Sequence, residues 1–254
     1  MGWAMVDGRL VPLSEACVPA DDPAVTTGWS VFETLVAHGD RPERIGEHLS
    51  RLARSAAAAR IAMPATDLLE REVIEVARRV GEARVRVTLT GGGRRLVTAT
   101  PLEQGRRHRP VRAIRGPHRD EPFLGGAVKH GSRAPWVVAV AASGVDEVLL
   151  VADDRFTEGT QAAILAVIDG EIWTAPHDGR ILESTTCLAL LERARALGIP
   201  VRREAPPARG PWDGLYVASV TRHLAPVVEL DGEPLPGWEP VGRRLVADDD
   251  AAPV

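Results

Sequence analysis

The chain has 254 residues, of which 44% are hydrophobic and 26% charged, a composition typical of a globular protein with one large domain or two small ones. The net charge of −4 shows no basic excess and argues against a nucleic-acid partner, and no run of about eighteen apolar residues is present to span a membrane. Residues 1–14 lack the pattern of a secretory signal, and Cys17 and Cys187 are too few for a disulfide framework. We therefore expect a cytoplasmic protein with no nucleic-acid or membrane partner.

The N-terminal half of the sequence is expected to form a sheet. Asp7-Gly8 is a turn signal, and Gly91-Gly92-Gly93 predicts a hairpin between two strands. From Ala83 to Thr90 apolar and polar residues alternate strictly, which is typical of a strand buried on one face. The expected strand segments are Met5 to Leu13, Val31 to Ala37, Ala83 to Thr90 and Leu96 to Thr100.

Two helices are expected between these strands. The first, Glu43 to Ile61, carries apolar residues at helical spacing along one face. The second begins at Thr66 or Asp67 and runs to about Val80, and Asp67 with Glu70 has the spacing of a capping box. The apolar face of the first helix consists of Ile45, Leu49, Leu52, Ala56 and Ala59.

The C-terminal half follows a stretch rich in Arg, Pro, Gly and His, where we place a domain boundary. Helices are expected at Ala134 to Ser143 and at Glu183 to Leu197, the latter opened by Ser184-Thr185-Thr186 and closed by Gly198. The sequence thus predicts an α+β fold with mixed sheets in two lobes, residues 1–118 and 119–254, the second ending in an acidic tail at Asp248-Asp249-Asp250. The expected strands are Val111 to Arg115, Glu147 to Ala152, Ala162 to Ile168, Glu171 to Thr174, Ile199 to Arg202, Leu215 to Ser219 and Pro226 to Leu230.

The basic residues are biased towards arginine: 30 of the 31 are Arg, and Lys129 is the single Lys. Arginine can replace lysine wherever only a positive charge is needed. It cannot do so where the amine must lose its proton and attack a carbonyl, because a guanidinium stays charged. Lys129 is therefore a candidate for amine chemistry, and the alternative is a surface lysine without a chemical role.

Six short segments occur in an order and spacing that make them specific together, although none is specific alone. They are Gly28–Leu35 (GWSVFETL), Glu47–Leu52 (EHLSRL), Val128–Arg133 (VKHGSR), Asp146–Leu150 (DEVLL) with Thr157–Thr160 (TEGT), Ile181–Thr186 (ILESTT), and Ala225–Val227 (APV) with Asp231-Gly232. From about residue 3 to 245 the chain therefore resembles the class IV aminotransferases, the fold type IV pyridoxal-phosphate enzymes. The resemblance implies a two-lobed α+β fold and pyridoxal 5'-phosphate as the cofactor. The histidines show no metal-ligand spacing, and no metal is expected.

The resemblance implies that Lys129 forms the covalent bond with the cofactor aldehyde and is the catalytic residue. Glu158 matches the acid that faces the pyridine nitrogen, where a carboxylate keeps the ring protonated. Without the resemblance, a Glu in Thr-Glu-Gly-Thr is more often a turn residue. The separation of Lys129 and Glu158 along the chain favours the catalytic interpretation.

The resemblance also implies a set of residues that bind the cofactor phosphate. Arg51 matches the family's phosphate-binding arginine and lies on the flank of the apolar helix face; the alternative is a solvent-facing Arg. Thr185 and Thr186 stand at a helix N-terminus, where free amides favour a phosphate, although such residues also serve as caps only. The amides of Val220 and Thr221 match a second phosphate loop.

Departures from the family pattern concern the substrate. Lys129-His130-x-x-Arg133 is similar to the pattern of aminodeoxychorismate lyases, and Ala134 stands where many aminotransferases have Tyr. Trp29 replaces a common Asp, and Arg94 or Arg95 is a candidate to hold a substrate carboxylate. The expected substrate-binding residues are Trp29, Thr34, Arg94, Arg95 and Arg133.

Three functions follow as hypotheses. The first is a lyase that converts 4-amino-4-deoxychorismate into pyruvate and 4-aminobenzoate, as in folate biosynthesis. The second is a transaminase of the branched-chain or D-amino acid type, acting on an amino acid or amine. The third, a homologue that only binds a ligand, is disfavoured because the sole lysine stands at the position that chemistry requires. The resemblance further implies a homodimer that acts on a small amine or amino acid.

Overall fold

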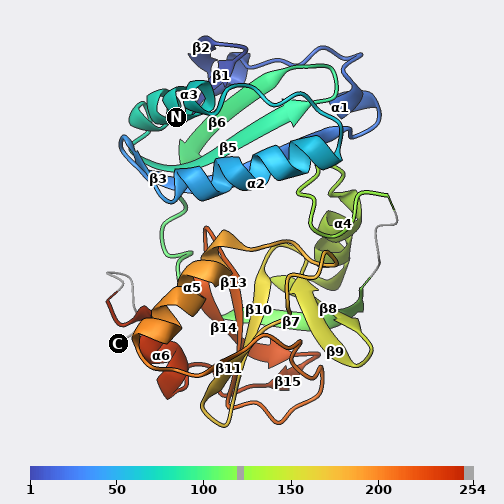
Figure 1. The fold of residues 1–254 in the computed structure, drawn as a ribbon, viewed down its shortest axis with the longest axis vertical. Coiled ribbons are helices and arrows are strands. Elements are labelled where there is room, and N and C mark those ends of the chain that lie inside the picture. The colour runs from blue at the N-terminus through green and yellow to red at the C-terminus, as the bar shows by residue number, and fades with distance from the viewer. Residues whose placement is uncertain (119–122, 249–254) are drawn as a thin grey trace. The chain divides into compact units, whose positions relative to one another are not determined.

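The computed structural model describes residues 1–118 and 123–248, and it divides into two compact units. The first unit is Met1–Glu103 with Gly126–Arg133, and the second is Gln104–Gly125 with Ala134–Val254 (Figure 1). This division differs from the expected boundary at residues 118/119. Strand β7 (Val111–Pro117) pairs with strands of the second unit, and residues 126–133 return to the first.

The first unit is a six-stranded sheet in the order β2-β1-β6-β5-β3-β4. All of its described strand pairs are antiparallel, which corrects the expectation of a mixed sheet in this lobe. Hairpins join β1 to β2, β3 to β4 and β5 to β6, and neighbours joined in this way must run antiparallel. The strands are β1 (Trp3–Val6), β2 (Arg9–Pro12), β3 (Ser30–His38), β4 (Arg41–Pro42), β5 (Glu82–Thr90) and β6 (Arg95–Pro101).

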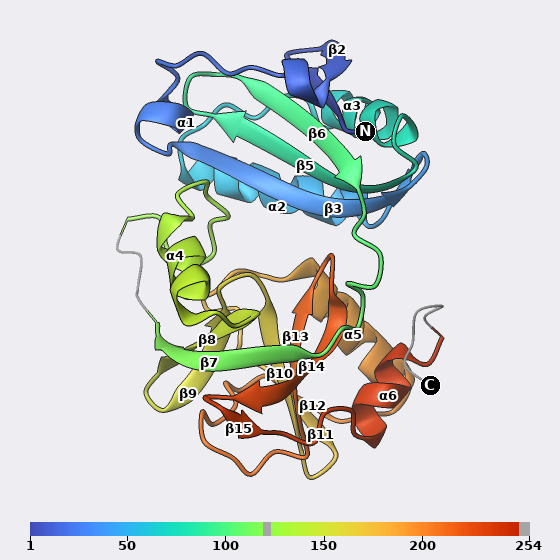
Figure 2. The ribbon, with the colours of Figure 1, turned by 180° about the vertical axis from the view of Figure 1, so that it is seen from behind.

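Helices α2 (Ile45–Ala58) and α3 (Thr66–Arg78) pack on one face of this sheet (Figure 2). Val85, Val87 and Leu89 of β5 point to that face and are buried, as their alternation predicts. On α2 the buried stripe contains Leu49 and Leu52. The two remaining helices of the unit are short: η1 (Leu13–Glu15) and α1 (Pro23–Thr26).

The expected capping box at the start of α3 is wrong. The N-cap residue is Ala65, and no side chain caps the helix. The carboxylate of Asp67 instead accepts a hydrogen bond from Arg71 at 2.7 Å, one turn along the helix. Because α3 begins at Thr66, Asp67 is the second residue of the helix and not the N-cap residue that a capping box requires.

The second unit contains a nine-stranded mixed sheet in the order β12-β11-β10-β13-β14-β7-β8-β9, with β15 paired to β14. The pairs β7–β8, β7–β14 and β11–β12 are parallel, and the others are antiparallel. The mixed sheet expected for this lobe is therefore confirmed. The strands besides β7 are β8 (Glu147–Ala152), β9 (Arg155–Gly159), β10 (Ala163–Ile168), β11 (Glu171–Trp173), β12 (Val201–Arg202), β13 (Gly214–Ser219), β14 (His223–Leu230) and β15 (Glu233–Pro234).

Strands β10 and β13 of this sheet are buried on both faces. Ile164 and Ala166 pack with Phe156 and Leu215 in one cluster, which lies on the side of β8 and β9. The alternate residues of β10 and β13 pack against helix α5 (Thr185–Ala196) in a second cluster. Because both faces are covered, these strands consist mostly of apolar residues, as their sequences predict.

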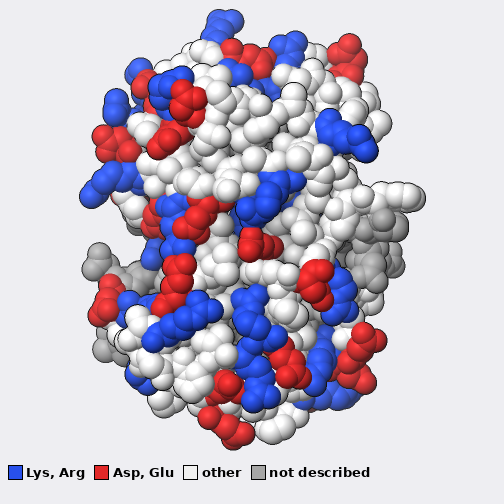
Figure 3. Space-filling view, in the orientation of Figure 1, with Lys and Arg blue, Asp and Glu red and all other residues white. Residues whose placement is uncertain are grey.

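The other helices of the second unit are α4 (Ala134–Ser143), which matches its expected bounds, and α6 (Pro240–Val246), which was not expected. Asp249 and Asp250 of the expected acidic tail lie outside the described residues. On the face in Figure 3, acidic and basic side chains are interspersed, as the small net charge suggests. None of the helices in the described part of the chain is long and apolar enough to cross a membrane.

Candidate functional site

Lys129 lies on a segment that is fixed against the edge of β3. The N–H of Phe32 donates to the carbonyl of Lys129 at 3.0 Å, and the N–H of Lys129 donates to the hydroxyl of Ser55 on α2 at 3.1 Å. His130 forms a β-bridge with Val31. These contacts determine where the lysine side chain leaves the backbone.

The side chain of Lys129 is half-buried, and its Nζ lies 5.1 Å from the centre of the Phe32 ring. Phe32 is itself buried and points to the sheet face that the helices leave open, since the neighbouring Glu33 points to α2. The amine therefore stands over an aromatic ring, in a setting with less water than the protein surface.

Glu33, on the helix side of β3, forms a buried ion-pair network with α2. Its carboxylate accepts hydrogen bonds from Nε and Nη2 of Arg51 at 2.6 and 2.7 Å. Nδ1 of His48 lies 2.8 Å from the same carboxylate. Burial alone would raise the pKa of Glu33, but the bonds from Arg51 and His48, with the charges of Arg51 and Lys129, lower it to about 2. Arg51 is therefore a buried, oriented cation rather than a solvent-facing side chain.

Arg86 was not expected from the sequence to be a functional residue. Its guanidinium carbon lies 3.6 Å from the centre of the Phe32 ring, on the face that also carries Thr34, its partner across β3 and β5. Burial, together with the charges of Arg84 and Arg133, lowers the pKa of Arg86 to about 10. Positive charges that destabilise one another in this way favour an anion among them.

One signal in the sequence points to Arg86. Arg84, Arg86 and Thr88 are the polar members of the strict alternation in β5, so they share one sheet face. That face is opposite the helices and next to Phe32. The alternation in this strand could therefore have identified Arg84 and Arg86 as candidate residues from the sequence.

The other expected substrate residues of this unit have partners of their own. Trp29 donates from Nε1 to the carbonyl of Ala59 at 2.9 Å, and 45% of the residue is exposed. Nη1 of Arg94 pairs with Asp7 at 2.8 Å, and Nε of Arg95 pairs with Glu72 of α3 at 2.7 Å. Arg95 therefore points to the helix side of the sheet. Thr34, in contrast, stands opposite Arg86 across β3 and β5, and the charge of Arg133 acts on Arg86.

In the second unit Glu158 is the last charged residue of β9. Its Oε2 accepts a hydrogen bond at 3.1 Å from the N–H of Leu182, in the segment that leads into α5. Ser184 caps this helix by accepting from the N–H of Cys187 at 3.2 Å. The structure thus connects the expected pyridine-nitrogen acid to the helix N-terminus that carries Thr185 and Thr186.

Thr185 and Thr186 occupy the first two positions of α5, and both are buried. The N–H groups of a helix's first turn have no partner within the helix, so they favour an anion. Val220 and Thr221 form the loop between β13 and β14, and Arg222, which follows them, is buried. Because α5 packs on β13, both expected phosphate-binding segments belong to neighbouring elements.

The residue types fit pyridoxal phosphate. Its aldehyde requires an amine, and Lys129 is the sole lysine. A carboxylate such as that of Glu158 would suit its pyridine nitrogen, and the amides at the start of α5 or a guanidinium such as that of Arg51 would suit its phosphate. Within the described residues there is no group of three His, Cys, Asp or Glu side chains that could hold a metal ion.

Among curated proteins, the chain is similar to transaminases along most of its length. A bifunctional aminodeoxychorismate lyase / D-amino acid transaminase of Mycobacterium tuberculosis is 28% identical, with 91% of this chain and 92% of that protein covered. A D-alanine aminotransferase of Listeria innocua is 24% identical, with 90% and 87% covered.

Solved structures agree in fold. The PLP-bound form of a hypothetical aminotransferase from Mycobacterium tuberculosis matches with a TM-score of 0.87 and 26% identity, covering 99% of this chain and 98% of that one. The branched-chain aminotransferase of Thermoproteus uzoniensis has a TM-score of 0.89 at 23% identity, covering 97% and 92%. The expected fold type IV architecture is therefore confirmed. The family model described as amino-transferase class IV matches residues 30–230, so the chain belongs to the class IV aminotransferase family.

Proposed function

We propose that this enzyme is a pyridoxal-phosphate-dependent lyase of the aminodeoxychorismate type, which releases pyruvate and 4-aminobenzoate. The observation that carries the proposal is that the guanidinium of Arg86 and the amine of Lys129 share the ring of Phe32, and that the charge of Arg133 acts on Arg86. Aminodeoxychorismate carries a ring carboxylate and an enolpyruvyl carboxylate, so neighbouring guanidiniums suit it. The M. tuberculosis relative with lyase activity in its name supports the same conclusion.

In this proposal each residue has a defined task. When bound, pyridoxal phosphate supplies a protonated pyridine ring that takes up negative charge from the substrate. Glu158 keeps the proton on that nitrogen. Lys129 removes the proton from the substrate carbon that bears nitrogen, and Phe32 limits the water around its Nζ. The carboxylate of Glu33 keeps the guanidinium of Arg51 oriented towards the phosphate.

The phosphate is held by backbone groups as well as by Arg51. The first-turn amides of α5, at Thr185 and Thr186, and those of Val220 and Thr221 are the donors that we propose. Backbone amides cannot turn away as a side chain can, so they fix the cofactor's position. Trp29 and Thr34 are proposed substrate contacts, Thr34 because it stands opposite Arg86. Arg94 and Arg95 are weaker candidates because Asp7 and Glu72 already pair with them.

The alternative is a transaminase acting on an amino acid or amine. It is favoured by the D-alanine aminotransferases among the relatives, and by the second activity in the name of the M. tuberculosis protein. Both reactions use the same lysine for proton transfer. They differ in whether the substrate's nitrogen stays on the cofactor, which then requires a keto acid to be regenerated.

A coupled pyruvate assay separates the two reactions. With aminodeoxychorismate and no keto acid, the lyase releases pyruvate over many turnovers. A transaminase releases no pyruvate from aminodeoxychorismate, and with an amino donor it converts the cofactor once and then requires a keto acid for further turnovers. Absence of pyruvate, together with conversion of the cofactor by D-alanine or a branched-chain amino acid, would contradict the lyase proposal.

The single lysine permits a direct test of the cofactor bond. Borohydride treatment of the holoenzyme followed by peptide mapping should label Lys129, since the only other primary amine is the N-terminus. Lys129→Ala and Lys129→Arg should both abolish turnover, and Arg is the control that keeps the positive charge. A label on Met1 alone would contradict the assignment.

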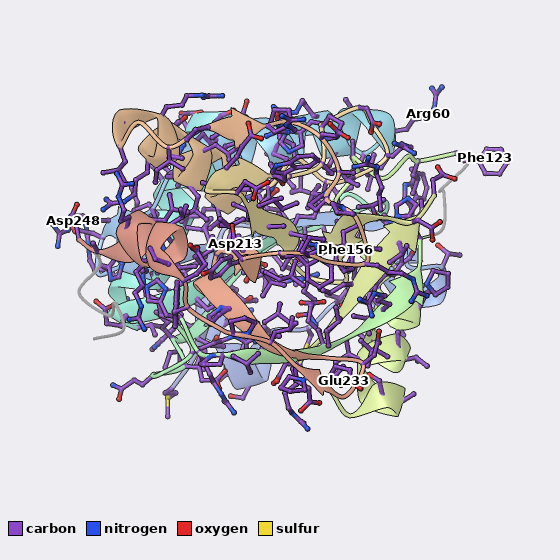
Figure 4. The ribbon with its side chains drawn as sticks, turned by 90° about the horizontal axis from the view of Figure 1, so that it is seen from below. Arg60, Phe123, Phe156, Asp213, Glu233 and Asp248 are labelled. Carbon is purple, nitrogen blue, oxygen red and sulfur yellow. The ribbon has the colours of Figure 1, made fainter. Side chains whose placement is uncertain are left out.

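We also propose a homodimer. The α4 helix is apolar and contains no buried residue, with Val137 and Val138 exposed by 59% and 62%. The ring of Phe123 is 96% exposed and extends away from the molecule (Figure 4). Exposed apolar groups of this size favour association. Sedimentation of the wild type and of Phe123→Ser should give a dimer and a weakened dimer, and a monomeric wild type would contradict the proposal.

A further inference from the structure

Glu147, the first residue of β8, is a buried carboxyl group that has no task in the proposed reaction. The residue is 0% exposed. Its Oε1 accepts hydrogen bonds from the hydroxyl of Thr160, from the N–H of Gln161 at 3.2 Å and from its neighbour Val148 at 3.3 Å. Its buried Oε2 has no hydrogen-bond partner among the described residues. A carboxyl group is costly to bury, so its retention here calls for a reason.

Two of the three hydrogen bonds that Glu147 accepts come from the turn that directly follows Glu158. A Cβ added to Gly159 would lie 3.2 Å from Cδ of Glu147, so the carboxyl group rests against the backbone next to Glu158. Thr160 is also bonded through its N–H to the carbonyl of Val148 at 3.1 Å. Together these contacts fix the end of β9, from which the Glu158 side chain leaves.

The start of β8 is held from the other side as well. Nη2 of Arg222, the buried residue after Val220 and Thr221, donates to the carbonyl of Asp146 at 3.1 Å. The backbone that carries Glu147 is therefore anchored at the β13–β14 loop. The backbone at Glu147 is held by Arg222, and its carboxyl group holds Thr160 and Gln161. The position of the turn after Glu158 therefore depends on the position of Glu147.

We propose that Glu147 is a positioning residue that keeps Glu158 directed at the cofactor nitrogen by holding the turn from Gly159 to Gln161. This inference rests on the proposed role of Glu158. Burial raises the pKa of Glu147, and the bonds from Thr160 and the charge of Arg222 oppose this only in part. A group that favours its neutral form can be replaced by glutamine with the acceptor oxygen kept.

The experiment compares Glu147→Gln, Glu147→Leu and Glu158→Gln with the wild-type holoenzyme. Two quantities are measured: the Kd for pyridoxal phosphate by tryptophan fluorescence, and the NMR resonance of the ring nitrogen in 15N-labelled cofactor. We expect Glu147→Gln to resemble the wild type. Glu147→Leu should move the ring-nitrogen resonance towards that of Glu158→Gln and raise the Kd about tenfold, the effect of one hydrogen bond.

The outcomes separate the inference from the function on which it rests. If Glu158→Gln shifts the ring-nitrogen resonance and a folded Glu147→Leu does not, the positioning role is wrong and the role of Glu158 stands. An unshifted resonance in Glu158→Gln would contradict the proposed role of Glu158 and the inference with it. If Glu147→Leu does not fold, Thr160→Val replaces it, since this variant removes the hydrogen bond from Thr160 to Oε1 of Glu147. A ring-nitrogen resonance in Thr160→Val that equals the wild-type resonance also overturns the inference.

Discussion

The buried network of Glu33 and Arg51 gives a quantitative prediction. Glu33→Gln removes the negative charge and leaves the guanidinium of Arg51 buried without it, where side-chain exposures are 0% and 6%. Breaking a buried ion pair on one side typically costs about 3–5 kcal/mol. The lowered pKa gives a similar figure, since a change from 4.5 to about 2 corresponds to roughly 3 kcal/mol of stabilisation.

The sign of the pH dependence follows from the direction of this shift. Because the folded pKa of Glu33 lies below the unfolded one, its contribution is complete above pH 4.5 and is lost as the pH falls towards 2. The free energy of unfolding in urea should therefore differ by about 3–5 kcal/mol between wild type and Glu33→Gln at pH 7. The difference should shrink below pH 4.5.

A matched control and a double variant complete this test. Glu47→Gln, on the same helix as Arg51, removes a carboxylate that is 42% exposed, and it should cost less than about 1 kcal/mol. Glu33→Gln/Arg51→Met leaves no unpaired buried charge, so its loss should be smaller than the sum of the single losses. Equal losses for Glu33→Gln and Glu47→Gln, or additive losses in the double variant, would refute the reasoning.

Three further predictions follow from single contacts. Arg86→Met should raise the KM for an anionic substrate about ten- to a hundredfold while sparing kcat for an uncharged amine, in steady-state assays. Ser184→Ala should remove the cap of α5 and lower the free energy of unfolding by about 1 kcal/mol in urea titrations. Glu43 and then Glu82 raise the pKa of His38, so His38→Gln should lose stability below pH 6.5 and match the wild type once the pH has risen through the raised value.

The fold could be predicted from the sequence where one local pattern decides the outcome. Strand β5 was expected from its alternation of apolar and polar residues, and α4 from its run of apolar residues. Both patterns involve only neighbouring residues, so they can be recognised without the structure. Strand β9 was missed because Arg155-Phe156-Thr157-Glu158-Gly159 contains no alternation and ends in turn residues. It pairs with β8 through a two-residue turn, Asp153-Asp154, which lacks the glycine that usually signals such a hairpin.

For the candidate site, the sequence offered residue identities and no contacts. The resemblance pointed to Lys129, Arg51 and Glu158, but their partners come from elsewhere in the chain. Glu33 was visible in the sequence as part of a Phe-Glu-Thr segment, yet its ion pair with Arg51 depends on how α2 packs on β3. Hydrogen-bond partners far apart in sequence require the packed structure.

The composition and the structure together explain why one lysine remains in a chain that uses arginine everywhere else. Arg86, on the open face of the first sheet, lies near Arg84 and Arg133, whose charges lower its pKa. Lys129 stands beside them, over the ring of Phe32. If charge were all that this position required, arginine would serve there as it does at its neighbours. What arginine cannot provide is an amine that gives up its proton, and the exception at Lys129 is therefore what the proposed bond to the cofactor would require.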